Sequence, residues 1–594
     1  MASVRRGQGT MNIDLQQNDL PPVSALFLIY FDIKAGYTIG WKRSLPGIEL
    51  GGVVEYKSLP SGLHTVKEDL IYFVHGEHAG LSAFVNAPAA EEARNARMIA
   101  VGVLVPLSYG RLGRSWKHAE KLKDMADELI VDSSNTKVLE DFWTQHRGYE
   151  TSPQKEEAES SLDSPATGVR FNATQNISQK DKHRRNRSAS DGAALLPPGN
   201  TLSAYHPAWS LLNLLEAFGP LIFPIHRAAL LRKRILITTH APVEQTCNFV
   251  YDLSVLSNIP LAVSDLLTSN APPQRLRPLF SIGVHDIPLL EQDLRASKSI
   301  SSLVEEEDVE TRDEVGRGWI ACTTDSIFAT KNNLYDVLVT LPPAHSANSS
   351  SKVWPKVQSS SGLDVKATQR DLRRYKALRW GLANHVSPPT SPSPNPILEP
   401  TTPQTISSLS PQRDGPMLDL PDTDDIVEPA SWSALAYSGF IWWASAGEQR
   451  LHSEEEFEAD DLLLSGLSLM PSTPNTPFAP RTPSQSMFSL RSDGQARQEM
   501  GIIAYFHRLT TQILTTLSDI VDVTDSDDER EDNDLLSEDD GPSVYASSAD
   551  MERMGLDVWS AADHQFIEEV TREYFGRRAT VEGRTVNICG VRIC

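Results

Sequence analysis

The chain has 594 residues, and its 55 basic and 78 acidic side chains give a formal net charge of −23 at pH 7. This balance excludes a nucleic acid as the main partner, because binding phosphate requires a basic surface. The four cysteines are scattered and lack the spacing of a disulfide framework or a zinc site. We therefore expect an intracellular protein without a metal centre.

The N-terminal residues lack the apolar stretch of a signal peptide, and no apolar run reaches the roughly 18 to 20 residues that span a bilayer. The sequence therefore predicts a cytoplasmic protein with no signal peptide and no transmembrane helix. Peripheral association with endomembranes stays open, because a protein without such a helix can still bind a membrane surface.

Apolar runs predict a first compact unit over residues 23–130. Apolar residues at helical spacing between Trp116 and Leu129 predict a long helix. Before this helix, strands are expected at 23–31, 37–41, 70–74, 81–85 and 99–105. The order of these elements predicts a small sheet with helices packed against it.

The stretch from His206 to Pro260 predicts the core of a second, central unit over residues 201–342. Apolar residues at helical spacing predict a helix over 207–218 and another from Pro242 onward. Between them, the β-branched run Ile235–Thr239 predicts a strand that is covered on both faces. Beyond this stretch we expect strands at 279–283, 319–322 and 334–341, and a charged loop at 292–314.

Polar segments divide the rest of the chain. They bury too little apolar surface to offset chain entropy, and they are expected as linkers or disordered inserts at 150–200, 343–366, 384–427, 466–498 and, strongly acidic, 522–549. The segments between them predict a mostly helical downstream unit, made of 371–383, 431–465, 500–521 and 550–594, the last of which ends in a strand. The expected fold class is therefore α/β, with two α/β modules followed by a split helical module.

No catalytic residue can be assigned from the sequence. It contains no GxxxxGK[ST] phosphate loop, no GxSxG nucleophile elbow and no clustered metal ligands, so we expect neither a cofactor nor covalent catalysis. The run Thr323-Thr324-Asp325 is favoured as a turn whose side chains bind backbone groups, with a functional cluster as the alternative. Arg232 and Arg234 are favoured as cations at a helix end, with contact to an acidic partner as the alternative. The basic face of 371–383 has a membrane or partner role as its alternative to solvation.

Serine and threonine residues in the polar segments predict regulation by kinases. Ser188 follows a basic run, and Ser526 and Ser537 are each followed by acidic residues. Four further candidates precede proline: Ser391, Thr473, Thr476 and Thr482. Each phosphate would add a charge of about −1.5 to −2.

Three collinear blocks resemble DENN-domain proteins of the LCHN type. The first begins ALFLIYFDIKAGYTIGW, the second comprises HPAWSLLNLLEAFGPLIFPIHRAALLRKRILITTHAPVEQTCNFVYDLSVLSNIP and GWIACTTDSIFATKNNLYDVLVTLP, and the third is the ending HQFIEEVTREYFGRRATVEGRTVNICGVRIC. Together they cover about half of the chain. The resemblance implies a longin-like N-terminal module followed by a central DENN module, in a fungal-like member of the family.

The resemblance also implies a function: guanine nucleotide exchange, or regulation, on a Rab-type small GTPase in intracellular membrane trafficking. Such a factor binds the GTPase switch regions more tightly when nucleotide is absent, and so promotes GDP release without a nucleophile or a base. The expected docking surface is the groove between the two modules, with Thr323, Thr324, Asp325, Arg232 and Arg234 as candidates. The alternative is a non-catalytic trafficking adaptor or scaffold that binds a GTPase or a membrane and is regulated by phosphorylation.

Overall fold

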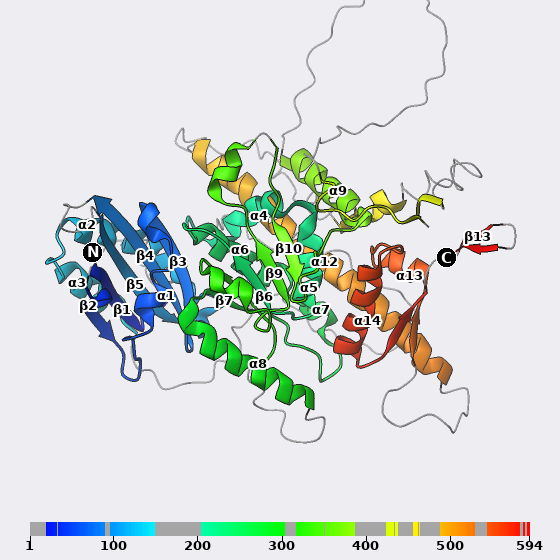
Figure 1. Ribbon diagram of the computed structural model, residues 1–594, viewed down its shortest axis with the longest axis horizontal. Coiled ribbons are helices and arrows are strands. Elements are labelled where there is room, and N and C mark those ends of the chain that lie inside the picture. The colour runs from blue at the N-terminus through cyan, green and yellow to red at the C-terminus, as the bar shows by residue number, and fades with distance from the viewer. Residues whose placement is uncertain are drawn as a thin grey trace, which may run out of the picture.

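Ten strands join into one mixed sheet in the order β10-β9-β6-β8-β7-β3-β4-β5-β1-β2. Figure 1 shows the sheet running from the blue N-terminal part into the green central part, with the red C-terminal segments beyond it. The structure is a computed structural model and describes residues 20–32, 34–88, 96–148, 203–302, 316–349, 351–386, 423–432, 434–436, 455–460, 462–463, 487–528, 543–582, 586–588 and 591–593.

The N-terminal half of the sheet is antiparallel. Its strands are β1 (Ala25–Asp32), β2 (Gly36–Ser44), β3 (Glu68–His75), β4 (His78–Pro88) and β5 (Ala96–Pro106). Helix α1 (Val54–Lys57) lies in the connection between β2 and β3, and α2 (Ala119–Val131) packs its buried apolar stripe on β4 and β5. The N-terminal unit extends past residue 130, where its end is expected from the sequence. It includes α3 (Lys137–His146), whose last residue accepts a hydrogen bond at its backbone oxygen from Val23 N at 2.9 Å.

The central half of the sheet is mostly parallel. Its strands are β6 (Ile235–Thr238), β7 (Arg277–Ser281), β8 (Trp319–Thr323) and β9 (Val337–Thr340), with β10 (Lys356–Ser359) antiparallel to β9 at the edge. Ile235, Leu236 and Ile237 are buried, as their β-branched run predicts. Helix α6 (Glu244–Leu256) packs against β3, β7 and β8, and α4 (Leu211–Phe218) and α5 (Ile222–Leu230) pack on α6.

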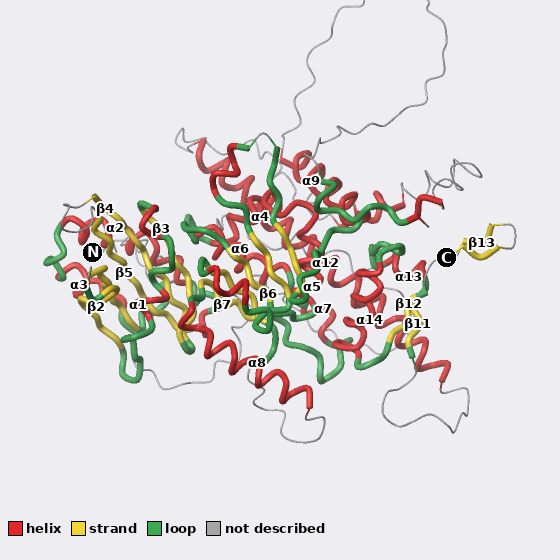
Figure 2. Tube along the Cα trace, in the orientation of Figure 1, coloured by secondary structure: helices red, strands yellow, loops and turns green. Residues whose placement is uncertain are grey.

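Two segments of the central region differ from the expectation. Residues 292–314 were expected as a loop, but α8 (Ile287–Ser302) extends through the first part of them, because Asp293 is buried and accepts bonds from Arg277 at 2.6 Å and Gly316 N at 3.0 Å. The expected linker 343–366 contains β10, whose backbone pairs with β9 although its sequence is polar. Figure 2 shows α8 as a long helix lying outside the central strands.

The downstream region is helical and rests on the central half. It contains α9 (Gln369–Val386), α12 (Met487–Asp528), α13 (Ser548–Arg553), α14 (Ala561–Phe575), the pair β11 (Val544–Ala546) and β12 (Ala579–Val581), and the hairpin β13 (Val586–Ile588) and β14 (Val591–Ile593). Helix α12 contacts α7 (Leu261–Ser264) of the central half. Buried side chains of α12 at Ile502, Phe506 and Leu509 anchor it. The α/β class with a helical downstream region is therefore confirmed.

Some residues expected to be disordered are ordered in the described part of the chain. Residues 487–498 begin α12, because a helix anchored by its apolar part extends at low cost into polar sequence. The same helix continues through 522–528, and β11 and the start of α13 occupy 544–549. Ile426 and Val427, within the expected insert 384–427, are buried, and Ala367 pairs with Val427. The segment 150–200 lies outside the described residues.

Within the described residues, one helical run, Pro207–Leu230, has the length and apolar composition of a membrane span. Inside the fold, 72 % of its apolar window is buried, which is how a core helix behaves. The run is divided into α4, α5 and two 3-10 turns, η6 (Pro207–Ser210) and η7 (Gly219–Leu221). It therefore gives only weak support for a membrane span.

Candidate functional site

The two halves of the sheet meet at a narrow seam. Strand β3 pairs with β7 through the single pair Phe73 and Phe280. Phe280 has a φ of 58°, a conformation that L-residues rarely adopt, and β7 bulges between Pro278 and Phe280. Such backbone persists only where its surroundings fix it, and Phe280 is fully buried. The seam therefore sets how the N-terminal segment 54–61 faces the central segments 281–286 and 325–327.

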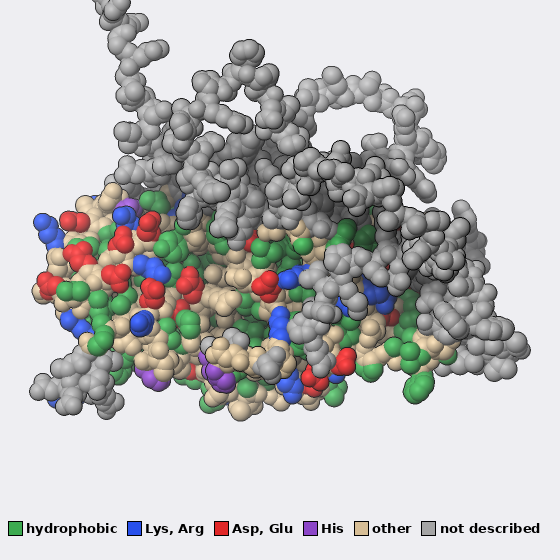
Figure 3. All heavy atoms as spheres, turned by 90° about the horizontal axis from the view of Figure 1, so that it is seen from above, with side chains coloured by type: hydrophobic (Ala, Val, Ile, Leu, Met, Phe, Trp, Pro, Cys, Tyr) green, Lys and Arg blue, Asp and Glu red, His purple; other side chains and the backbone are tan. Residues whose placement is uncertain are grey.

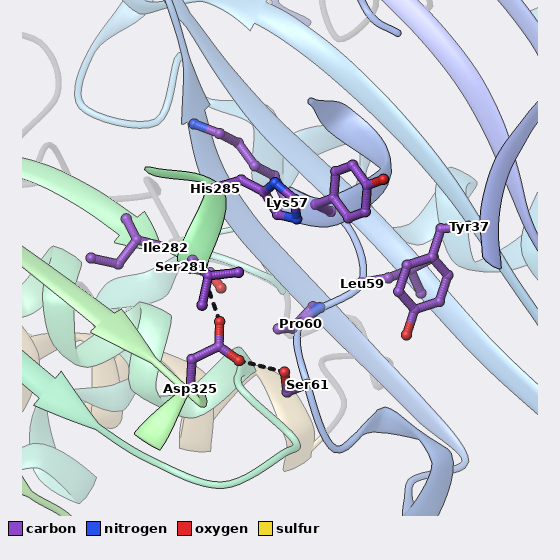
Figure 4. A pocket seen from close by; sticks show the side chains of 12 residues that line it. Tyr37, Lys57, Leu59, Pro60, Ser61, Ser281, Ile282, His285 and Asp325 are labelled. Carbon is purple, nitrogen blue, oxygen red and sulfur yellow. Dashed lines mark hydrogen bonds between the residues drawn. The ribbon is translucent and has the colours of Figure 1, made fainter. Parts of the chain in front are cut away.

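A pocket with a volume of about 130 Å³ opens at this junction. Its lining comes from both modules, and Figure 4 shows side chains of the blue N-terminal part and the green central part facing one another across it. The lining residues are Tyr37, Tyr56, Lys57, Leu59, Pro60, Ser61, Ser281, Ile282, Gly283, Val284, His285 and Asp325. A small pocket therefore lies between the two modules, and its use as a docking groove stays a prediction.

Three contacts bridge the modules around this pocket. Lys57 Nζ of α1 lies 2.8 Å from Asp286 Oδ1 in η8 (Val284–Asp286), and both side chains are largely buried. The rings of Tyr56 and His285 stack with their centroids 3.8 Å apart. Within its own module, Lys57 Nζ also donates to Val74 O at 2.6 Å, which fixes the position of the ammonium group. Separating a buried ion pair leaves a buried charge without its partner, which destabilises the fold strongly. The contacts between the modules therefore hold this surface in one arrangement.

Asp325 supplies the third bridge. One of its carboxylate oxygens accepts a hydrogen bond from Ser61 Oγ, and the other accepts one from Val284 N at 3.1 Å (Figure 4). Thr323 is buried, and its Oγ1 accepts a bond from Asp325 N at 3.1 Å. The Thr324 hydroxyl is buried without a partner among the described residues. The three neighbours therefore form a turn whose last residue reaches the junction.

Large apolar side chains are exposed on the elements that meet here. Tyr56 is 41 % exposed, Val284 42 %, Ile327 in the 3-10 helix η10 (Ser326–Thr330) 46 %, and Leu289 on α8 55 %. Together with His285 and Asp325 they are called the junction surface below. Exposed apolar side chains that gather beside a built pocket are typical of a binding surface. Sequence periodicity did not reveal them, because they come from four separate elements, α1, η8, α8 and η10.

Arg232 and Arg234 do not reach this surface. Arg232 is buried with a φ of 52°, and its guanidinium donates to Ala229 O at 2.7 Å, Gln274 O at 2.8 Å and Pro273 O at 2.9 Å. Arg234 forms a two-pronged bond to Asp336, with its shortest distance at 2.6 Å. Both cations bind groups of the central module itself, so their candidate role in partner binding is withdrawn.

Basic side chains of α9 also pair with acidic groups of the chain, some in the core and some at the surface. Arg370 and Arg374 bind Asp460, Arg373 binds Glu456, and Arg379 binds Glu216 at 3.0 Å. These ion pairs give several of the cations a structural role, and a membrane role for this face stays a prediction. In Figure 3 basic and acidic side chains are interspersed over the described part of the face shown, which is typical of a solvated surface.

Two histidines of the core are uncharged at neutral pH. Burial lowers the pKa of His206 to about 3 and that of His226 to about 3, so both rings are neutral at pH 7. His206 Nδ1 accepts a bond from Ala208 N at 3.1 Å, which caps η6. Within the described residues, no group of three His, Cys, Asp or Glu side chains could hold a metal ion.

Of the predicted phosphorylation residues, the structure describes only Ser526. It lies exposed near the end of α12, and its Oγ donates to Asp522 O at 2.7 Å. The others, Ser188, Ser391, Thr473, Thr476, Thr482 and Ser537, lie outside the described residues.

The chain is thus an α/β protein whose two modules are joined through one sheet and carry a partly apolar surface at their junction. The family model described as "DENN domain-containing protein 11" matches residues 26–351, more than half of the chain. The chain therefore belongs to this family of DENN-domain proteins. A second model, "Domain of unknown function (DUF4484)", matches residues 427–594, and the finer LCHN assignment stays a prediction.

Curated relatives agree with this assignment. DENN domain-containing protein 11 of Danio rerio is 30 % identical over 324 residues, which are 53 % of this chain and 53 % of that protein. The Xenopus laevis protein of the same name is 31 % identical over 56 % of this chain and 63 % of its own length. The chain thus matches little more than half the length of these relatives. "Uncharacterized protein ANR2" of Saccharomyces cerevisiae is 23 % identical over 94 % of this chain and 92 % of its own length.

Proposed function

We propose that this chain is a guanine nucleotide exchange factor for a Rab-type small GTPase in membrane trafficking, and that the GTPase binds the junction surface. The observation that supports this most is a surface built by both modules of a DENN-domain protein, in which four apolar side chains, Tyr56 among them, are exposed together with His285 and Asp325. A partner that covers this surface must touch both modules at once.

Exchange by such a surface is a matter of linkage. If the GTPase without nucleotide binds the surface more tightly than the GDP form, nucleotide affinity falls by the same factor on the complex. A coupling of about 3 kcal/mol corresponds to roughly a 150-fold change in affinity. The three bridging contacts support this role, because a rigid surface can favour one conformation of its partner over another.

The direct test is release of fluorescent GDP from a panel of purified Rab proteins by the full chain. Acceleration with at least one Rab supports the proposal. Absence of acceleration across the panel, with micromolar chain present, contradicts exchange activity.

The alternative is a non-catalytic adaptor that binds a GTPase or a membrane peripherally and is regulated by kinases. The observation that favours it is the clustering of Ser/Thr-Pro residues in polar segments that hold no block of the family resemblance. Binding to a Rab without faster GDP release would identify the adaptor, and vesicle flotation of the full chain would report membrane association.

A further inference from the structure

Three carboxylate oxygens are buried between α6 and α12 without a hydrogen-bond partner of normal geometry among the described residues. They are both oxygens of Glu499 and Oδ1 of Asp252, and Oδ1 of Asn248 is in the same state. Glu499 and Asp252 are both 0 % exposed. An ionised carboxylate in such a place is strongly disfavoured unless a donor or a cation faces it. Some other species must therefore neutralise this pair.

The two carboxyl groups come from helices that pack on one another. Asp252 lies one turn after Asn248 on the same face of α6, and its second oxygen accepts a bond from Ser210 Oγ at 2.5 Å. Burial first, and the charge of Asp252 second, raise the pKa of Glu499 to about 9. Burial also raises the pKa of Asp252 well above its usual range. The two groups therefore influence one another inside the core.

Among the described residues, the groups that act on this pair include no positive charge. Besides Ser210 of η6, the backbone N–H of Leu212 in α4 favours the ionised form of Glu499. Elsewhere along this interface, His507 of α12 bonds Val255 O at 2.9 Å, and Arg111 bonds Ser254 Oγ at 3.0 Å. Two carboxyl groups that are fully buried on helices that pack together, without a cation beside them, are expected to hold at least one proton.

We propose that the buried carboxyl groups of Glu499 and Asp252 hold protons in the folded state, so that docking of α12 on the central module takes up protons at neutral pH. When α12 separates from α6, both groups meet water and ionise. The proton on Glu499 stabilises the docking of α12. This contribution is complete below about pH 4.5 and is lost as the pH rises through about 9. Acid therefore tightens α12 and alkali loosens it, independently of the junction surface and of the proposed exchange activity.

Hydrogen–deuterium exchange of the full chain tests this, with variants compared at equal pH so that the intrinsic exchange rates cancel. Glu499→Gln keeps the shape of the side chain but cannot titrate. Between about pH 6.5 and 8.5, the opening of residues 499–517 in wild type should increase relative to this variant by about tenfold per pH unit for one proton. Asp252→Asn should reduce the pH dependence in the same way. Glu568→Gln, on an exposed position of α14, should behave as wild type.

Equal pH dependence in wild type, Glu499→Gln and Asp252→Asn would overturn the proposal. A bound cation in place of the proton would give a different pattern. In that case Glu499→Gln would loosen α12 at every pH, and a chelator would loosen wild type. That pattern would also overturn the proposal, and if Glu499→Gln does not fold, the Asp252→Asn comparison decides.

Discussion

Asp69 on β3 caps helix α6 of the central module, with its Oδ2 accepting a bond from Val243 N at 2.8 Å. Its Oδ1 accepts a second bond from Glu244 N at 3.1 Å, and the side chain is buried. Cys247 Sγ, further along α6, lies 3.7 Å from Tyr72 O on the same strand. The two modules are therefore joined through their core as well as along the edge of the sheet.

Removal of this cap should loosen the junction. Asp69→Ala is expected to lower the free energy of unfolding by about 1–2 kcal/mol, because two buried N–H donors lose their acceptor. Hydrogen exchange of the first turn of α6 should rise together with that of β3. Unchanged exchange in β3 would show that the cap matters only to the helix.

The same carboxyl group should make stability depend on pH. Burial outweighs the two N–H donors and raises the pKa of Asp69 to about 7. The folded state thus holds a proton that the unfolded state loses near pH 3.8, so this contribution is full below that pH and is lost as the pH rises through about 7. Asp69→Asn should therefore reduce the dependence of the unfolding free energy on pH between about 4 and 7, by up to the amount that corresponds to one bound proton.

Lys57 and Asp286 should be coupled strongly. Lys57→Met is expected to cost about 3–5 kcal/mol, since it leaves a buried carboxylate without its cation, while Lys57→Met with Asp286→Leu should cost less. Lys356, which pairs with Asp364 at an exposed position, gives the matched control, and Lys356→Met should cost less than about 1 kcal/mol. Double-mutant cycles followed by urea denaturation measure the coupling energy of each pair. Similar coupling energies for the two pairs would contradict a junction that is held rigid by Lys57 and Asp286.

Arg232 should prove structural. Arg232→Ala is expected to destabilise the chain by about 2–4 kcal/mol, because buried carbonyl groups lose a charged donor. Its effect on GDP release, expressed per folded molecule, should be negligible. Arg295→Ala, at a highly exposed side chain of α8, should change stability by less than about 0.5 kcal/mol. A fall in exchange rate that exceeds the loss of folded protein would return Arg232 to the binding surface.

The periodic parts of the fold could be predicted from the sequence. The β-branched run at Ile235 gives a buried central strand, and the apolar stripe of α2 gives a helix on the sheet. Polar elements escaped prediction, because α8 and β10 are held by tertiary contacts such as Arg277 with Asp293 and by pairing with β9. Local sequence carries neither signal.

The candidate site was predictable only in part. Asp325 does lie at the module junction, where the family resemblance placed the groove. Arg232 and Arg234 were misjudged because a run of cations does not reveal which backbone carbonyls or carboxylates will face it. Tyr56 and His285 are far apart in sequence, and only the pairing of β3 with β7 brings their rings together.

The most direct test of the account replaces exposed apolar residues of the junction surface and measures GDP release from the responsive Rab. Val284→Asp with Ile327→Asp should reduce the exchange rate at least tenfold, since about 1.4 kcal/mol of lost binding corresponds to that factor. Val131→Asp, at an exposed apolar position on α2 away from the pocket, should leave the rate unchanged. Equal exchange rates for wild type and the Val284/Ile327 variant, with both folded, would contradict the claim that the GTPase binds at the junction.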